Sequence, residues 1–434
     1  MTGSGRDAGQ LNDGGLRAGS RGGGRSWWKR LLLAQEAGLV LVILVMAIVL
    51  AIAGGTKKKI DRIALVETPS QPTLVASQVT ESLSEIQVIS GGTTSTYFKA
   101  SGWELRPRNA EGRLLYRERT VNKFLDIDNL FLQLVFCSFI AIMAVGITAV
   151  IAMGGIDLSI GSIYALAALF GAMSLRALQA NSLGIPYDST TLPSDGGASL
   201  FAALPVALLV CCGTGALCGL FNGALIVGLR VHPFIITLGT MAAFRGLVAI
   251  PTQAQSVGSF PESFTRGFFK LQAGGVNPVP VAIMLLVGVV GVFVLARTVL
   301  GRRVYAIGGN EIAAKYAGIP VGKIKIIIYT IMGALAGLSA CVYLGYLGAA
   351  ETNAGNGYEL KVIAAAVIGG ASLSGGRGSA LGAILGALLV QLIDNGMLIL
   401  NIDQNYNQIV MGSAIVLAVV LDQMKTRLMP GGGR

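Results

Sequence analysis

Residues Val304–Ile319 read VYAIGGNEIAAKYAGI and form a polar, helix-forming stretch between two long apolar segments. Asn310 is a favourable N-cap residue, and Glu311 places a carboxylate in the first turn, where the helix dipole favours negative charge. The sequence therefore predicts a helix of about two turns over Glu311–Ala317 that follows a flexible Gly308-Gly309 pair. This stretch is too polar to cross a membrane and too short to be a domain, so we interpret it as a docking helix.

Basic residues surround this expected helix. Gly318 favours its termination, and positive charges lie on both sides of it, at Arg302, Arg303, Lys315, Lys323 and Lys325. Lys and Arg residues gathered between two membrane segments are typical of a cytoplasmic loop.

The composition predicts an all-α polytopic membrane protein. Hydrophobic residues make up 53% of the chain, charged residues 13%, and the mean hydropathy is +0.68. Because a bilayer crossing needs roughly 20 apolar residues, the long apolar runs exclude a soluble protein with one large core. Glycines inside these runs, such as Gly382 and Gly386, favour closely packed helices. We expect about ten spans, near Gly38–Gly54, Asn129–Ala152, Ile156–Leu175, Leu200–Val227, Ile235–Ile250, Val281–Ala296, Ile324–Leu347, Leu360–Ala371, Ser379–Leu398 and Asn407–Leu421.

The net charge of +11 is distributed as in a membrane protein and not as in a nucleic-acid-binding protein. With the N-terminus inside, 17 Lys and Arg residues fall in inner segments and 5 in outer ones, which include Arg245 and Lys361. This bias predicts that both termini are cytoplasmic. The long segment 55–123 is left out of the comparison, because long loops cross the membrane largely regardless of their charge.

The expected spans divide the chain into five parts. Residues 1–36 form a basic cytoplasmic tail, 37–54 the first transmembrane helix, 55–123 a periplasmic insertion, 124–421 the permease core and 422–434 a second tail. The insertion alternates apolar and polar residues over Leu74–Ser90, Thr93–Trp103 and Arg113–Val121, with turns at Gly91-Gly92 and Pro107–Gly112. This pattern predicts short β-strands, with an irregular spacer as the alternative.

A polar motif interrupts the apolar stretch that runs from Leu130 to Ala172. It reads GGIDLSIGS over Gly154–Ser162, and a similar Gly-Ser motif occupies Gly369–Gly378. An acid such as Asp157 is costly at membrane depth unless it faces protein, a cavity or water. We therefore expect Asp157, Ser159 and Asn222 to line or support a translocation path, or else Asp157 and Ser159 to cap the following helix.

These motifs resemble the ribose-type permeases of ATP-binding-cassette (ABC) importers. The resemblance rests on runs that include AVGITAVIAMGGIDLSIGS (Ala144–Ser162), HPFIITLGTMAAFRG (His232–Gly246), GRRVYAIGGNEIAAKYAGIPVGKIKI (Gly301–Ile326), GYELKVIAAAVIGGASLSGGRGS (Gly357–Ser379) and DNGMLIL (Asp394–Leu400). It implies a bacterial inner-membrane permease that imports a monosaccharide, with a cytoplasmic ATPase subunit, a periplasmic sugar-binding protein, a second permease copy and membrane lipid as partners. In that family the polar loop contacts the ATPase, which assigns coupling to Gly308, Gly309, Asn310, Glu311, Ala314, Lys315, Ala317 and Gly318.

The sequence does not indicate an enzyme. It contains no GxxxxGK[ST] phosphate loop, so ATP hydrolysis is assigned to a separate chain. The five cysteines fall in apolar spans without metal or disulfide spacing, and we expect no cofactor. Two other functions remain open: a branched-chain amino acid permease of the same superfamily, and an ion-coupled secondary transporter, which usually has more ionisable residues within its spans.

Overall fold

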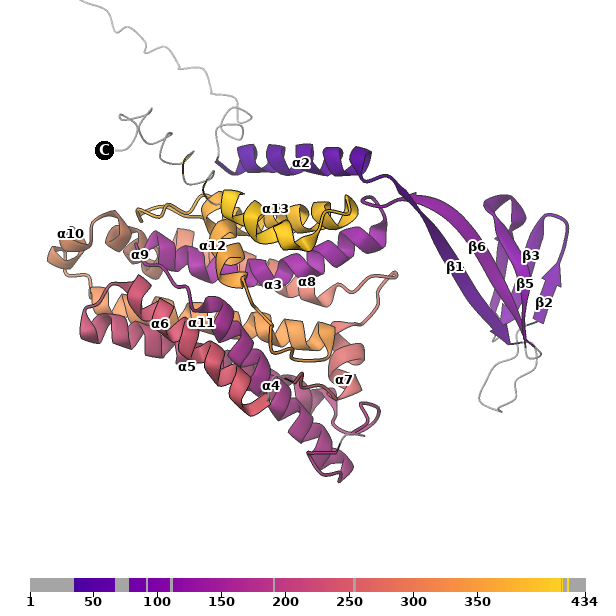
Figure 1. Ribbon diagram of the computed structural model, residues 1–434, viewed down its shortest axis with the longest axis horizontal. Coiled ribbons are helices and arrows are strands. Elements are labelled where there is room, and N and C mark those ends of the chain that lie inside the picture. The colour runs from indigo at the N-terminus through magenta and orange to yellow at the C-terminus, as the bar shows by residue number, and fades with distance from the viewer. Residues whose placement is uncertain are drawn as a thin grey trace, which may run out of the picture.

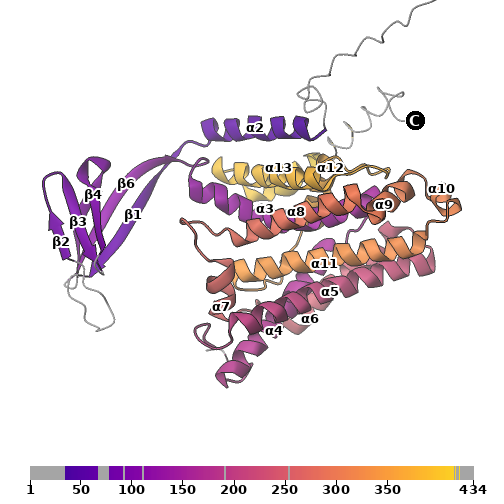
Figure 2. The same ribbon diagram turned by 180° about the vertical axis from the view of Figure 1, so that it is seen from behind.

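The computed structural model describes residues 35–66, 78–90, 93–109, 112–189, 192–252 and 255–414, together with 416 and 420. The two predicted tails lie almost entirely outside these residues. Figures 1 and 2 show a bundle of long helices from which a β unit projects at one end, whereas α9 and α10 lie at the opposite end. The helices are α2 (Gln35–Ala53), α3 (Ile127–Ala152), α4 (Ile160–Leu183), α5 (Leu200–Leu229), α6 (Pro233–Thr252), α7 (Glu262–Phe264), α8 (Val279–Arg297), α9 (Val299–Gly309), α10 (Glu311–Tyr316), α11 (Val321–Leu347), α12 (Tyr358–Ile368) and α13 (Ala380–Ile399).

Eight helices in the described part of the chain are long and apolar enough to cross a membrane: α2, α3, α4, α5, α6, α8, α11 and α13. The protein is therefore a helical, multi-pass membrane protein, as predicted. The expected span Leu360–Ala371 differs, because α12 has 11 residues and extends only about 16 Å. The last expected span is helical over residues 407–414, and most of the remainder lies outside the described residues.

Glycines bring α5 and α11 into backbone contact. A methyl group added to Gly215 would lie 2.1 Å from the carbonyl oxygen of Gly333, and one added to Gly219 would lie 2.1 Å from that of Tyr329. The four-residue spacing of these glycines is the pattern that lets membrane helices approach closely. The predicted role of Gly382 and Gly386 is confirmed, since methyl groups there would lie 1.9 Å and 2.0 Å from carbonyl oxygens of the α12 segment.

Polar side chains join α3 and α13 within the bundle. The Gln391 amide donates to Gln133 Oε1 at 2.7 Å, and the Asn395 amide donates to Asn129 Oδ1 at 3.0 Å. Such interhelical hydrogen bonds contribute roughly 0.6 kcal/mol each in membrane proteins. They fix the rotation of α13 against α3 and therefore the position of the turn that precedes α13.

The β unit consists of two three-stranded antiparallel sheets, ordered β1-β6-β5 and β2-β3-β4. A small core of its own joins them, with Ile86, Val88 and Leu115 fully or almost fully buried between Val79, Tyr97, Trp103 and Leu105. A folded element is therefore present, and the irregular-spacer alternative does not hold for the described strands. The strands are β1 (Thr56–Val66), β2 (Gln78–Glu81), β3 (Glu85–Ser90), β4 (Thr93–Phe98), β5 (Trp103–Asn109) and β6 (Gly112–Asn122).

The strand boundaries differ from those expected in two ways. β1 was not predicted, because its run of charged residues does not alternate with apolar ones. It is a strand because it pairs with β6 over eleven residues, a long-range contact that the local sequence does not indicate. The single expected strand Leu74–Ser90 is, in its described part, the hairpin β2–β3, which turns at Ser82–Ser84.

The lysines that follow α2 are paired with acids of the same region. Lys57 contacts Asp126 at 2.9 Å, Lys59 contacts both Asp126 and Asp128, and Lys58 contacts Glu118 at 2.7 Å. Burial raises the pKa of Asp126, but its hydrogen bonds and ion pairs with Lys57 and Lys59 outweigh this effect, so the pKa lies below its ordinary value. The pairs of Lys57 and Lys59 attach β1 to the start of α3, and that of Lys58 attaches it to β6, which explains how such a basic run can follow a membrane span.

Candidate functional site

Helix α10 is capped at both ends, as the sequence predicts. The Asn310 side chain accepts a hydrogen bond from the backbone N–H of Ala313 at 2.9 Å. At the other end Gly318 adopts a φ of +79°, and the N–H of Ile319 donates to the carbonyl of Ala314 at 3.1 Å, the closing bond of a Schellman motif. The helix covers Glu311–Tyr316, one residue shorter than expected.

One face of α10 packs on the bundle and the other is open. Ala314 is buried, and the Glu311 carboxylate pairs with Lys325 of α11 at 2.9 Å. Ile312 and Tyr316 are 69% and 89% exposed and lie four residues apart, on one side of the helix. These two residues were not predicted from the sequence, although an exposed apolar pair at this spacing in a polar loop is the signal of a docking face.

Gly308 is a packing residue and not part of a flexible linker, which corrects the expectation for Gly308-Gly309. Both glycines are helical and end α9. A methyl group on Gly308 would lie 1.9 Å from the carbonyl oxygen of Ala152 at the end of α3, and 2.5 Å from the N–H of Gly376. Gly309 has nothing within 4 Å of the same position.

The two Gly-rich breaks singled out in the sequence meet at Gly308. Gly376 donates its N–H to the carbonyl of Ala152 at 2.8 Å, and Tyr305 of α9 donates its hydroxyl to the carbonyl of Gly378 at 2.7 Å. A methyl group on Gly154 would lie 4.0 Å from the Cα of Gly308. We call this contact the glycine junction; it connects the α9–α10 segment to the connections that precede α4 and α13.

Asp157, Ser159 and Asn222 come together as one fully buried cluster. Asp157 Oδ1 accepts from the Ser159 N–H at 2.7 Å and from the Ser159 hydroxyl at 2.6 Å. The Asn222 amide of α5 donates to Ser159 Oγ at 2.8 Å and to Asp157 Oδ2 at 3.4 Å. The expectation that Ser159 caps α4 through its side chain is wrong, since its hydroxyl makes no cap bond and is used within the cluster.

Two of the cations counted as external have partners within the protein. Arg245 belongs to α6 and donates to the carbonyls of Ala354 and Gly355 at 2.8 Å and 3.1 Å. Lys361 belongs to α12 and pairs with Asp394 at 2.6 Å.

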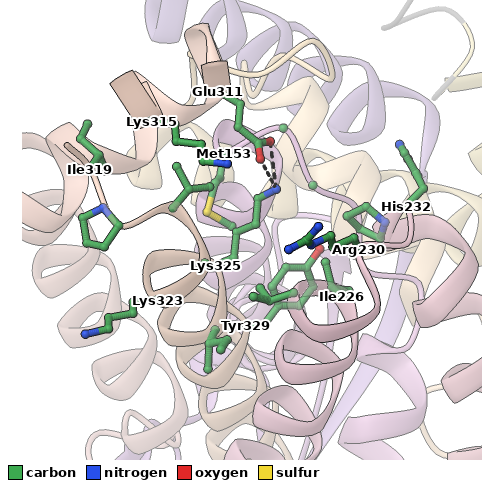
Figure 3. Close-up of a pocket in the computed structure, with 18 of the residues that line it drawn as sticks. Met153, Ile226, Arg230, His232, Glu311, Lys315, Ile319, Lys323, Lys325 and Tyr329 are labelled. Carbon is green, nitrogen blue, oxygen red and sulfur yellow. Dashed lines mark hydrogen bonds and ion pairs between the residues drawn. The ribbon is translucent and has the colours of Figure 1, made fainter. Parts of the chain in front are cut away.

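A cavity of about 1050 Å³ opens between α10, the first turn of α11 and the connection from α5 to α6. Figure 3 shows Lys315, Lys325, Glu311 and Arg230 around it. Its inner wall includes Gly154, Gly155 and Tyr329, and Tyr329 donates its hydroxyl to the carbonyl of Ile156 at 3.3 Å. The buried Asp157 cluster does not line this cavity, although Gly154 and Gly155, which precede it in the chain, do.

Comparison with known proteins matches most of this architecture. The family model described as "Branched-chain amino acid transport system / permease component" matches residues 129–419. The ribose import permease protein RbsC of Escherichia coli (strain K12) is 38% identical over 304 residues, which cover 70% of this chain and 88% of that protein.

Two further relatives carry different names. The D-allose transport system permease protein AlsC of Escherichia coli (strain K12) is 37% identical over 301 residues, covering 69% of this chain and 85% of that protein. The autoinducer 2 import system permease protein LsrC of Enterobacter sp. (strain 638) is 32% identical over 293 residues, covering 67% and 78%.

No solved structure matches the chain. The family match begins after α2 and the β unit, so it covers the glycine junction, α10 and the Asp157 cluster but not the insertion. The chain belongs to the family of branched-chain amino acid transport system permease components, and it is a multi-pass transport subunit rather than an enzyme.

Proposed function

We propose that this chain is the permease subunit of an ATP-driven, binding-protein-dependent importer for a monosaccharide. The observation that carries the proposal is the 37–38% identity of its core to permeases named for ribose and allose. The matched region contains α10 and the glycine junction, which supports a shared transport mechanism. A branched-chain amino acid importer is the second candidate, because the family description names that substrate class.

The proposal is tested by transport in proteoliposomes that contain the complete importer. ATP-dependent uptake of radiolabelled D-ribose or D-allose is expected, with no uptake when ATP is replaced by a non-hydrolysable analogue. Leucine uptake under the same conditions with neither sugar transported would instead establish the amino acid importer. Uptake of a sugar without ATP would establish a secondary transporter.

We infer that α10 seats in a groove of the ATPase subunit and that Gly308–Gly318 couples ATP hydrolysis to transport. Three features support this role: the rigid capping of α10, its exposed Ile312 and Tyr316, and its location at the end of the bundle opposite the β unit (Figure 1). On this arrangement α10 is cytoplasmic and the β unit is periplasmic.

We further propose that residues 55–123 form a unit separate from the 124–421 core and that this unit contacts the sugar-binding protein. A second permease copy completes the proposed complex.

This orientation predicts where a cysteine reacts. Ser95 is exposed on β4, so Ser95→Cys is expected to react with a membrane-impermeant thiol reagent added to intact cells with a permeable outer envelope. Ala313→Cys, exposed on α10, is expected to react only after the membrane is disrupted. The native cysteines give little background, because four are buried and Cys212 is half-buried. The reverse labelling pattern would invert the orientation.

We propose that the Asp157 cluster supports the translocation path by fixing the connection between α3 and α4 against α5. In the wild type, the Asn222 amide donates to Asp157 Oδ2. Asp157→Asn places an amide N–H₂ at that position, so this contact becomes a repulsion between two donors. Uptake per molecule is expected to fall several-fold, on the order of 1–2 kcal/mol, while the thermal stability changes less. Asp188→Asn, on an exposed loop, is the matched control with wild-type uptake. Lost stability with normal uptake per molecule would reduce the cluster to a purely structural role.

A further inference from the structure

The cavity beside α10 carries positive charge that the protein itself does not neutralise. Four cationic side chains and one carboxylate line it, and that carboxylate, Glu311, is already paired with Lys325. Arg230 and Lys315 have no ion pair or side-chain hydrogen bond with any residue in the described part of the chain. Unneutralised cations in a concave surface attract anions, because the walls exclude part of the screening solvent.

The geometry concentrates this charge on one side of the cavity. In Figure 3 the side chains of Lys315 and Arg230 point toward the Lys325–Glu311 pair, whereas Lys323 points away from them. The first turn of the 27-residue helix α11 also borders the cavity, at Val321 and Gly322. A helix begins with N–H groups that have no partner within the helix, so this turn favours an anion in the same place.

An apolar surface adjoins the charged one. Leu229 and Phe234 flank the connection from α5 to α6 that contributes Arg230 to the cavity, and they are 60% and 42% exposed. Ile235 follows and is 61% exposed. An anionic cavity ligand with long apolar chains would cover these residues, whereas a small soluble anion would leave them exposed.

We propose that this cavity binds the phosphate headgroup of an anionic phospholipid, whose acyl chains lie against Leu229, Phe234 and Ile235. Arg230 and Lys315 contact the phosphate, and Lys325 neutralises the neighbouring Glu311 carboxylate through their 2.9 Å pair. The volume of about 1050 Å³ is sufficient, since pockets of roughly 300–1,000 Å³ hold drug-sized ligands. On the orientation proposed above, the lipid comes from the cytoplasmic leaflet, where a basic recess between transmembrane helices suits an anionic headgroup.

Native mass spectrometry of the full-length, delipidated protein tests the site directly. Phosphatidylglycerol is expected to bind and phosphatidylcholine is not, because only the former carries net negative charge. Arg230→Gln is expected to weaken phosphatidylglycerol binding about fivefold or more, and Arg230→Lys to preserve it. Lys323→Gln removes the same charge from a side chain that points away, and it should change the affinity by less than about twofold.

Three results would overturn the proposal. Equal binding of the two lipids would exclude headgroup recognition, and equal weakening by Arg230→Gln and Lys323→Gln would reduce the effect to diffuse surface charge. Glycerol 3-phosphate binding as tightly as phosphatidylglycerol would identify a soluble anion as the ligand.

A second variant keeps the test decisive if Arg230→Gln fails to fold. Ile235→Ser should weaken phosphatidylglycerol binding through its acyl chains, and an unchanged affinity would exclude the proposed lipid contact. The assay needs neither ATP nor sugar, so its failure leaves the proposed importer function untouched, and a failure of sugar uptake leaves the lipid site untouched.

Discussion

Replacing Gly308 with Ala is expected to abolish most of the transport, although the added group is a single methyl. That methyl would lie 1.9 Å from the carbonyl oxygen of Ala152, so α9, the end of α3 or both must move. Overpacking of this kind costs about 1–3 kcal/mol, and here it separates α9 from the connection that precedes α4. Uptake by the complete importer in proteoliposomes, expressed per folded permease, measures the effect, and thermal unfolding measures its cost in stability.

Gly309→Ala provides the matched control for this prediction. The residue is adjacent, is also helical, and has nothing within 4 Å of the added methyl, so uptake and stability should stay near wild type or improve slightly. If Gly308→Ala transports as well as Gly309→Ala, the glycine junction is not needed in the transport cycle. If both substitutions abolish transport, the segment requires flexibility and not close packing.

Ile312→Asp is expected to prevent the ATPase subunit from associating with the permease while the permease itself folds normally. The side chain is 69% exposed, so the charge has little effect on the free subunit, but it would have to be desolvated in an apolar groove. Hot-spot side chains of this type typically contribute about 2 kcal/mol or more to a protein interface. Co-purification of the ATPase with tagged permease measures the association, and uptake should disappear with it.

Leu83→Asp is the control for a general effect of new surface charge. Leu83 is fully exposed in the β2–β3 turn, at the opposite end of the molecule, so the ATPase should still co-purify. Normal ATPase association with Ile312→Asp would show that α10 is not the docking helix.

Glu311→Lys tests the same helix from its packed side, since it breaks the pair with Lys325. It should therefore reduce uptake with the permease still in the membrane.

Local signals explain what the sequence could predict. The boundaries of α10 follow from Asn310 and Gly318, whose capping roles depend only on their neighbours. Asp157 was recognisable because an acid in an apolar stretch has few stable environments, and its buried cluster is one of them. The long spans follow from apolar length alone.

Contacts between distant segments account for what the sequence could not predict. Nothing near Gly308 distinguishes it from Gly309; the difference arises because α3 ends beside one and not the other. β1 is charged along its first residues, and only its pairing with β6 and with the acids at the start of α3 makes it a strand.

The register of β1 against β6 has a consequence for the modularity of the chain. Thr56 pairs with Asn122, so the polypeptide leaves α2 and returns to α3 at neighbouring points, however many residues lie between. The entropic cost of bringing the two chain ends together is then met where the β1–β6 pair begins. Changes in the length of the chain farther from the helices add little to that cost. A short turn placed there would reconnect α2 to α3 without moving either helix, so this position can gain or lose an entire folded unit without a change in how the two helices pack.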